Sequence, residues 1–272
     1  MDELLGGPMC TRIAFTLCAL LLLLPPAVAG ERDQVPDADE LAKALIERLE
    51  SHDARIRYEA LQEASQNQHP SLTSPLIKAL KDDYPDNRKR AAQALATRAD
   101  SKAQKRAATA LAHRLPSLSE KKEKTEELVV IAKALGDLGQ KSSVKPLLKG
   151  LDPKTPRAEA EARLKAVAEI PHAEAIERLM QYGSKGRRGN THANLVVAAL
   201  RHATGQKLGK DPDAWRAWWR ENRATFDFEA AARERDEKRD REQEKADRKK
   251  GRRKNRDGKR RKRKDDPEEE TR

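Results

Sequence analysis

The sequence predicts an all-α protein in which pairs of short helices repeat along the chain and stack into an α-solenoid. The chain matches itself at a long interval, because "SPLIKAL" at residues 74–80 aligns with "KPLLKGL" at 145–151, 71 positions later. Within such segments apolar residues recur every three or four positions, which is the period of an amphipathic helix. Only 3% of the residues are aromatic, which disfavours one thick globular core.

A second match places the repeat unit at about half of that interval. "TALAHRL" at residues 109–115 lies 35 positions after the first segment. A second set of segments carries equivalent apolar residues, which are Leu61, Leu95, Leu135, Val167 and Leu200. Successive members of this set are separated by 34, 40, 32 and 33 positions. We expect each unit to hold two helices of roughly 11–15 residues. One such pair cannot bury its apolar face alone, so neighbouring pairs must stack.

The segments "SPLIKAL", "KPLLKGL" and "IAKALGDLG" resemble the HEAT-repeat family, specifically its exported bacterial members. The resemblance covers residues 37–205 and implies about five helix pairs. It also implies a non-enzymatic scaffold that binds another protein along the face formed by the second helices. On that face we predict Arg57, Arg88 and Arg201 as recognition residues. The resemblance does not indicate the partner or the oligomeric state.

The first 29 residues are typical of a secretory signal peptide. An apolar run of about twelve residues follows Arg12, and small residues precede a predicted cleavage between Ala29 and Gly30. We therefore expect an exported protein, periplasmic or extracellular, with no membrane span after cleavage. The alternatives are an uncleaved anchor or a buried N-terminal helix, and translation starts at either Met1 or Met9. Both cysteines lie in this leader, so the mature chain would have no disulfide or thiolate site.

All three tryptophans lie in "DPDAWRAWW", within a segment, 206–225, that we predict to be a capping helix. Asp211 suits the N-cap and Pro212 the first helical turn. Trp215, Trp218 and Trp219 then share one helical face and would cover the last helix pair, as a solenoid end requires. The alternatives are a sugar-stacking platform or a protein-binding hot spot.

No catalytic or metal-binding motif is evident, and the six histidines are scattered singly, so we expect no enzyme activity, metal or cofactor. The glycine-rich stretch 182–190 contains Lys185, Arg187 and Arg188 just before a predicted helix. Glycine-rich backbone at a helix N-terminus can hold an anion. The alternative is a lengthened turn without a ligand.

The C-terminal region divides into an exposed charged helix, 226–247, and a tail, 248–272, predicted to be disordered. Residues 248–264 hold thirteen Lys or Arg and one acid. The cations that we predict to contact a polyanion, such as nucleic acid, acidic polysaccharide or anionic lipid, are Arg252, Arg253, Lys254, Arg260, Arg261, Lys262, Arg263 and Lys264. Polyanion binding is therefore the alternative function, unless the tail has no ligand or the acidic end "DDPEEE" masks it.

Overall fold

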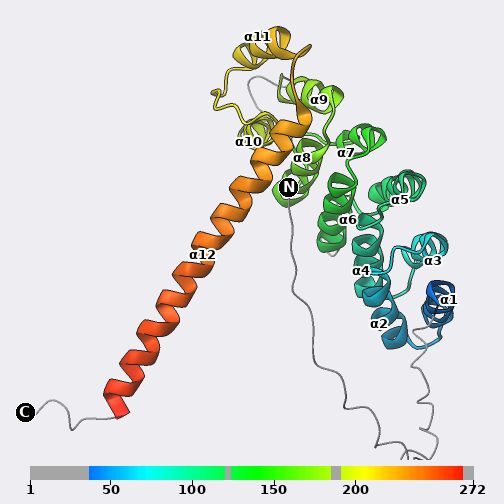
Figure 1. Cartoon of the computed structure of the whole chain (residues 1–272). Coiled ribbons are helices and arrows are strands. Elements are labelled where there is room, and N and C mark those ends of the chain that lie inside the picture. Colours follow the sequence, from blue (N-terminus) through cyan, green and yellow to red (C-terminus); the bar gives the residue numbers. More distant parts are fainter. Residues whose placement is uncertain (1–36, 120–123, 185–190, 266–272) are drawn as a thin grey trace, which may run out of the picture. The chain divides into compact units, whose positions relative to one another are not determined.

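The structure, a computed structural model, describes residues 37–119, 124–184 and 191–265, with 251–265 described as helical backbone. Every regular element in these ranges is a helix (Figure 1). The five predicted pairs are α1 (Ala38–Leu49) with α2 (Ala54–Ala64), α3 (Thr73–Ala79) with α4 (Pro85–Ala96), α5 (Ser101–Arg114) with α6 (Thr125–Asp137), α7 (Val144–Leu148) with α8 (Arg157–Glu169), and α9 (Ala173–Ser184) with α10 (Ala193–Thr204). The helices α11 (Pro212–Asn222) and α12 (Phe228–Asp265) follow.

The helices are arranged in two rows, as the repeat predicts. The first helices of the pairs contact one another in the order α1, α3, α5, α7 and α9, and the second helices in the order α2, α4, α6, α8 and α10 (Figure 1). The five equivalent apolar residues of the second helices are all buried: Leu61, Leu95, Leu135, Val167 and Leu200. The core is therefore one continuous layer between the two rows, which confirms the α-solenoid.

Two of the first helices are shorter than the predicted 11–15 residues. The helix α3 has seven residues and α7 has five, and each follows a short 3-10 helix, η1 (Pro70–Leu72) and η4 (Lys141–Ser143) respectively. Pro146 stands near the start of α7, and Gly150 just beyond its end has a φ of +77°, which favours glycine. Gly150 therefore ends α7 on its C-terminal side, whereas Pro146 lies in the first turn of the helix, where proline is tolerated.

The second-helix row is packed most closely between α6 and α8. Gly136 of α6 makes this possible, because a methyl group at that position would lie 3.0 Å from the Cα atom of Ala166. Buried alanines continue the contact on both helices, among them Ala132 and Ala168. Small side chains let two helix backbones approach each other, which explains why an alanine-rich chain suffices for this core.

The helix α11 caps the end of the solenoid, as predicted. Asp211 accepts a hydrogen bond from the backbone N–H of Asp213 at 2.9 Å, so it is the N-cap. Trp215 and Trp219 are 2% and 4% exposed, whereas Trp218 is half-buried. Because two of the three indoles lie in the core, they offer no flat exposed platform on which a sugar could stack.

Beyond the five pairs, α11 and α12 continue the two rows. The helix α11 packs on α9, and α12 packs on α10. Phe226 contacts the rings of Trp218 and Trp219, with ring centroids 5.9 and 5.7 Å apart. From the base of α12, Arg235 donates a hydrogen bond to the carbonyl of Ala168 at 2.9 Å. Together these contacts make an incomplete sixth pair.

The helix α12 extends to Asp265. This is well past residue 247, the predicted end of the charged helix, so the first part of the segment predicted to be disordered is helical. Lysine, arginine and glutamate have high helix propensity, and the first proline after α12 begins is Pro267. The side chains of residues 236–250 are all exposed, in agreement with the predicted absence of an apolar stripe. Residues 266–272 lie outside the described ranges.

Candidate binding groove

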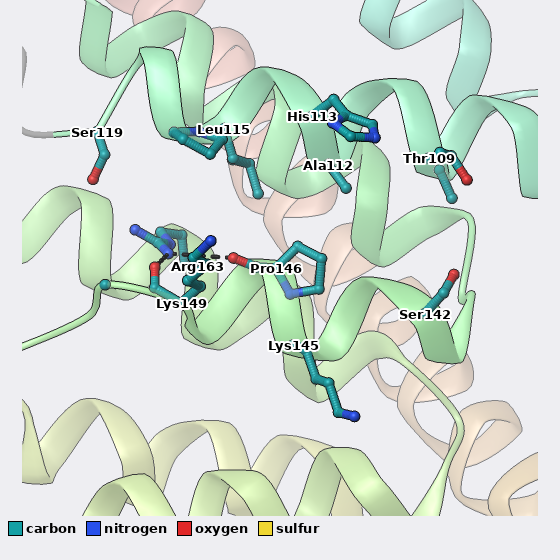
Figure 2. A pocket seen from close by; sticks show the side chains of 13 residues that line it. Thr109, Ala112, His113, Leu115, Ser119, Ser142, Lys145, Pro146, Lys149 and Arg163 are labelled. Atoms are coloured by element: carbon teal, nitrogen blue, oxygen red, sulfur yellow. Dashed lines mark hydrogen bonds between the residues drawn. The ribbon is translucent and has the colours of Figure 1, made fainter.

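A groove of about 820 Å³ lies between α5 and α7. One wall is formed by α5 and the turn after it, and the other by η4 and α7 (Figure 2). Its apolar lining comes from small or rigid side chains, namely Ala108, Ala112, Leu115, Pro116 and Pro146. Its polar lining comes from Thr109, His113, Ser119, Ser142, Lys145 and Lys149.

The groove exists because the two facing helices differ in length. The helix α5 has fourteen residues and α7 has five. The C-terminal half of α5 therefore has no α-helix of equal length beside it in the first-helix row. In the second-helix row below, α6 and α8 stay in close contact. The solenoid is thus closed along one row and open along the other at the same repeat junction.

Arg163 of α8 forms the floor of the groove and closes the end of α7. Its side chain is buried, and its Nε atom donates to the carbonyl of Leu147 at 2.7 Å. Its Nη2 atom donates to the carbonyl of Lys149, and its Nη1 atom pairs with the buried Glu159 at 2.7 Å. The Ser119 hydroxyl donates to the same carboxylate at 2.6 Å. The floor is therefore neutral overall and its hydrogen bonds are made within the chain.

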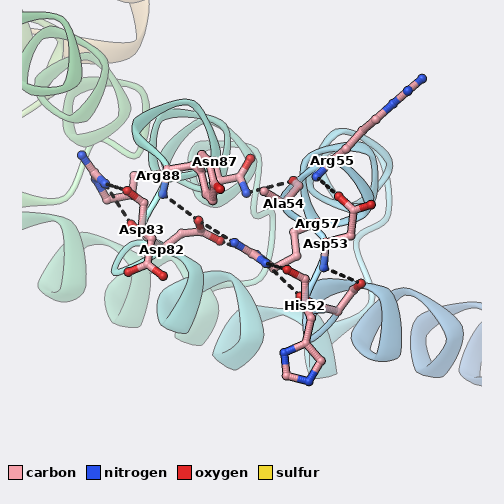
Figure 3. Close-up of polar contacts among 11 residues, drawn as sticks. His52, Asp53, Ala54, Arg55, Arg57, Asp82, Asp83, Asn87 and Arg88 are labelled. Atoms are coloured by element: carbon pink, nitrogen blue, oxygen red, sulfur yellow. Dashed lines mark hydrogen bonds and ion pairs between the residues drawn. The ribbon is translucent and has the colours of Figure 1, made fainter.

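Figure 3 shows that two of the predicted recognition residues, Arg57 and Arg88, have internal partners. Arg57 forms a two-fold ion pair with Asp82 at 2.6 and 3.0 Å, and donates to the carbonyls of Ser51 and His52. Burial alone raises the pKa of the Asp82 carboxyl, but the hydrogen bonds from Arg57 and from a backbone N–H outweigh it and hold that pKa below its ordinary value. Arg57 thus joins the first two repeats.

Arg88 has the same arrangement one repeat later. It donates to the carbonyls of Asp82 and Asp83 at 2.9 and 3.0 Å, and its Nε atom donates to Glu127 of α6 at 2.9 Å. Arg201, the third predicted recognition residue, donates twice to the carbonyl of Leu208 before the cap. Arg57 and Arg88 thus share Asp82 as a partner, and each of the three arginines holds neighbouring segments of the solenoid in place.

The other predicted sites lie wholly or partly outside the described residues. These are the cleavage site at Ala29 and Gly30, and the loop cations Lys185, Arg187 and Arg188. The tail cations from Arg252 to Lys264 lie on the helical backbone of α12. The groove was not predicted from the sequence. The signal that marks it is the absence of any Asp or Glu from 101–119 and from 140–151.

The chemistry of the groove suits binding. Within the described ranges, no three His, Cys, Asp or Glu side chains are grouped so that they could hold a metal ion. The same ranges contain no helix with the length and apolar character needed to cross a membrane. His113 is exposed on the α5 wall. The groove thus combines an apolar interior with cations and hydroxyl groups at its edge, which is the composition of a recognition site.

The two-row stack of helix pairs places this chain among the α-solenoid proteins. Residues 42–121 match the family model for HEAT repeats, and the later pairs continue the same two rows. Residues 42–121 therefore form HEAT repeats. A search of curated proteins found no match to it.

Proposed function

We propose that this chain is a non-enzymatic, exported scaffold that binds another protein, and that the groove between α5 and α7 receives a segment of that partner. HEAT repeats commonly mediate contacts between proteins, which supports the class of function. The observation that supports the location is the groove of about 820 Å³. That volume lies within the range of about 300–1,000 Å³ over which proteins enclose ligands.

The exposed charges of the second helices favour the groove as the binding site over that row. Several of these charges pair with one another: Arg55 with Glu59 at 3.2 Å, and the half-buried Lys89 with both Asp86 and Glu126 at 2.8 and 3.2 Å. A partner that bound there would have to replace these pairs with pairs to its own charges. The new exposed pairs would add little binding free energy, because exposed ion pairs contribute little. The groove needs no such exchange, because its apolar wall is already open.

One pair of variants tests the groove directly. Ala112 is half-buried and lines the groove, so Ala112→Phe should fill it without changing the charge. Ala198 is exposed on α10, so Ala198→Phe is the matched control. The partner would be captured from the exported fraction, identified and purified, and its Kd measured against both variants. We expect at least a tenfold weaker Kd for Ala112→Phe only, and equal Kd values would refute the groove.

Export is supported by the leader sequence and is tested separately. N-terminal sequencing of the protein recovered outside the cytoplasm should begin at Gly30, the residue after the expected cleavage. An N-terminus at Met1 or Met9 on protein that stays in the cytoplasm would contradict export. The groove proposal would survive that result, because it depends on residues 101–163.

We also propose polyanion binding through the C-terminal part of α12 as a second function. The observation that favours it is that α12 stays helical to Asp265, while residues 248–264 carry thirteen cations and one acid. A charged helix without an apolar stripe suits electrostatic contact with phosphates. Residues 228–247, by comparison, hold six cations and eight acids.

Salt dependence tests this second function. Binding of the chain to a short DNA duplex should weaken steeply as salt rises, with a log–log slope of about −0.9 per phosphate neutralised. Deletion of residues 248–272 should abolish this binding while leaving capture by the groove intact. Duplex binding that survives the deletion would assign the polyanion contact to another surface.

A further inference from the structure

The groove has a charge asymmetry that points to the kind of segment it binds. The segments that form its two walls, residues 101–119 and 140–151, contain four and three Lys or Arg respectively and no Asp or Glu, and of these cations Lys145 and Lys149 line the groove. Elsewhere the chain mixes both signs, with 57 basic and 45 acidic residues overall. A groove walled by one sign of charge attracts the opposite sign and focuses its field.

Among the described residues, two of these cations already have a carboxylate within ion-pair distance, whereas Lys145 and Lys149 do not. Arg114 pairs with Glu127 at 3.0 Å, and Lys141 lies 4.0 Å from Glu174. In the described part of the chain, no carboxylate lies within ion-pair distance of the ammonium groups of Lys145 or Lys149. Both lysines line the groove and are exposed, and the side chain of Lys145 extends away from α5 (Figure 2).

The interior of the groove selects against a small anion. The guanidinium of Arg163, the one buried cation of the lining, already donates to Glu159 and to backbone carbonyls. A phosphate or a free carboxylate would find no unused buried donor there. The available cations stand at the edge, and the space between the walls is lined by alanine, leucine and proline side chains.

We propose that the groove binds an acidic amphipathic segment of a partner protein. Its apolar side chains would lie along Ala108, Ala112 and Leu115, and its Asp or Glu side chains would reach Lys149 at the edge and Lys145 on the outer side of α7. This inference rests on the proposed function and adds the chemistry of the partner segment. The chain's own acidic end, "DDPEEE" at 265–270, does not match because it has no bulky apolar side chain for the wall.

The test uses the full chain and a fluorescein-labelled peptide made of two LEELLEE repeats, with fluorescence anisotropy to measure Kd. Two matched peptides replace every glutamate by lysine or every leucine by serine, and both should bind much more weakly. A 12-nucleotide single-stranded DNA serves as an anion without apolar side chains. We expect the leucine–glutamate peptide to compete with the captured partner for the wild-type groove, and the DNA not to compete.

Two charge-reversed variants locate the binding site. Lys145→Glu with Lys149→Glu should weaken the leucine–glutamate peptide by roughly tenfold, because two favourable contacts become repulsive. Lys43→Glu with Lys207→Glu makes the same change in net charge on exposed positions of α1 and of the stretch after α10 and should leave the Kd within about twofold. Circular dichroism checks that both variants keep their helices.

Each outcome bears on a specific claim. If the control variant weakens peptide binding as much as the groove variant, the peptide responds to net charge alone and the inference fails. If the DNA competes for the groove and the peptide does not, the groove binds nucleic acid, which also overturns the inference. If the peptide fails to bind while Ala112→Phe still prevents capture of the partner, the proposed function stands and the acidic chemistry is wrong. If Ala112→Phe changes neither the binding of the peptide nor the capture of the partner, both proposals fail.

Discussion

Replacement of Trp215 by alanine should destabilise the C-terminal end of the solenoid more than any other single change in α11. The indole is 2% exposed, and it borders a cavity of only about 30 Å³ shared with Met180, Val196 and Leu200. Removal of a buried tryptophan side chain costs about 3–5 kcal/mol. Its Nε1–H also donates to the carbonyl of Gly209 at 2.9 Å, and loss of that hydrogen bond adds about 1 kcal/mol.

Trp218 provides the matched control, because it is half-buried on the same helix. We expect Trp218→Ala to cost at most about 2 kcal/mol, in proportion to the smaller apolar area that it covers. Urea unfolding followed by circular dichroism measures both variants. Because solenoids can unfold from one end, hydrogen exchange should show that Trp215→Ala opens α9 and α10 first. Equal losses for the two variants, or unchanged exchange in α10, would refute the capping role.

Three further predictions concern the solenoid itself. The pKa of Asp82 is lower in the folded chain than in the unfolded chain, so its ionised form stabilises the fold above about pH 4, and this contribution is lost as the pH falls further. Asp82→Asn should therefore flatten the acid branch of the curve of unfolding free energy against pH. An unchanged curve would contradict the assignment. Arg163→Met should cost about 3–5 kcal/mol because it removes one member of the buried ion pair with Glu159. Arg163→Met combined with Glu159→Gln should recover part of that loss in urea unfolding. Gly205→Ala, at a φ of +72°, should lower the free energy of unfolding by about 1–2 kcal/mol, whereas Gly209→Ala, which has no neighbour within 4 Å, should change little.

Local patterns were sufficient to predict the helix pairs and the cap. The spacing of apolar residues within a helix marks which face of that helix is buried. A similar pattern recurs in each repeat because each repeat packs against equivalent neighbouring helices. The N-cap at Asp211 depends only on residues two positions apart in the sequence. Such short-range features can be read without knowing where distant segments lie. The charged helix is longer than predicted, because Lys and Arg have high helix propensity and α12 continues to Asp265.

The sequence by itself determined the repeat, its burial pattern and the closing tryptophan helix, because these follow from periods that recur within and between neighbouring segments. Only the tertiary structure decided the roles of the arginines, since Arg57 meets Asp82 across 25 residues and Arg235 meets Ala168 across 67. It also decided where the solenoid opens. The groove results from a mismatch in length between α5 and α7, two helices that become neighbours only when the repeats stack.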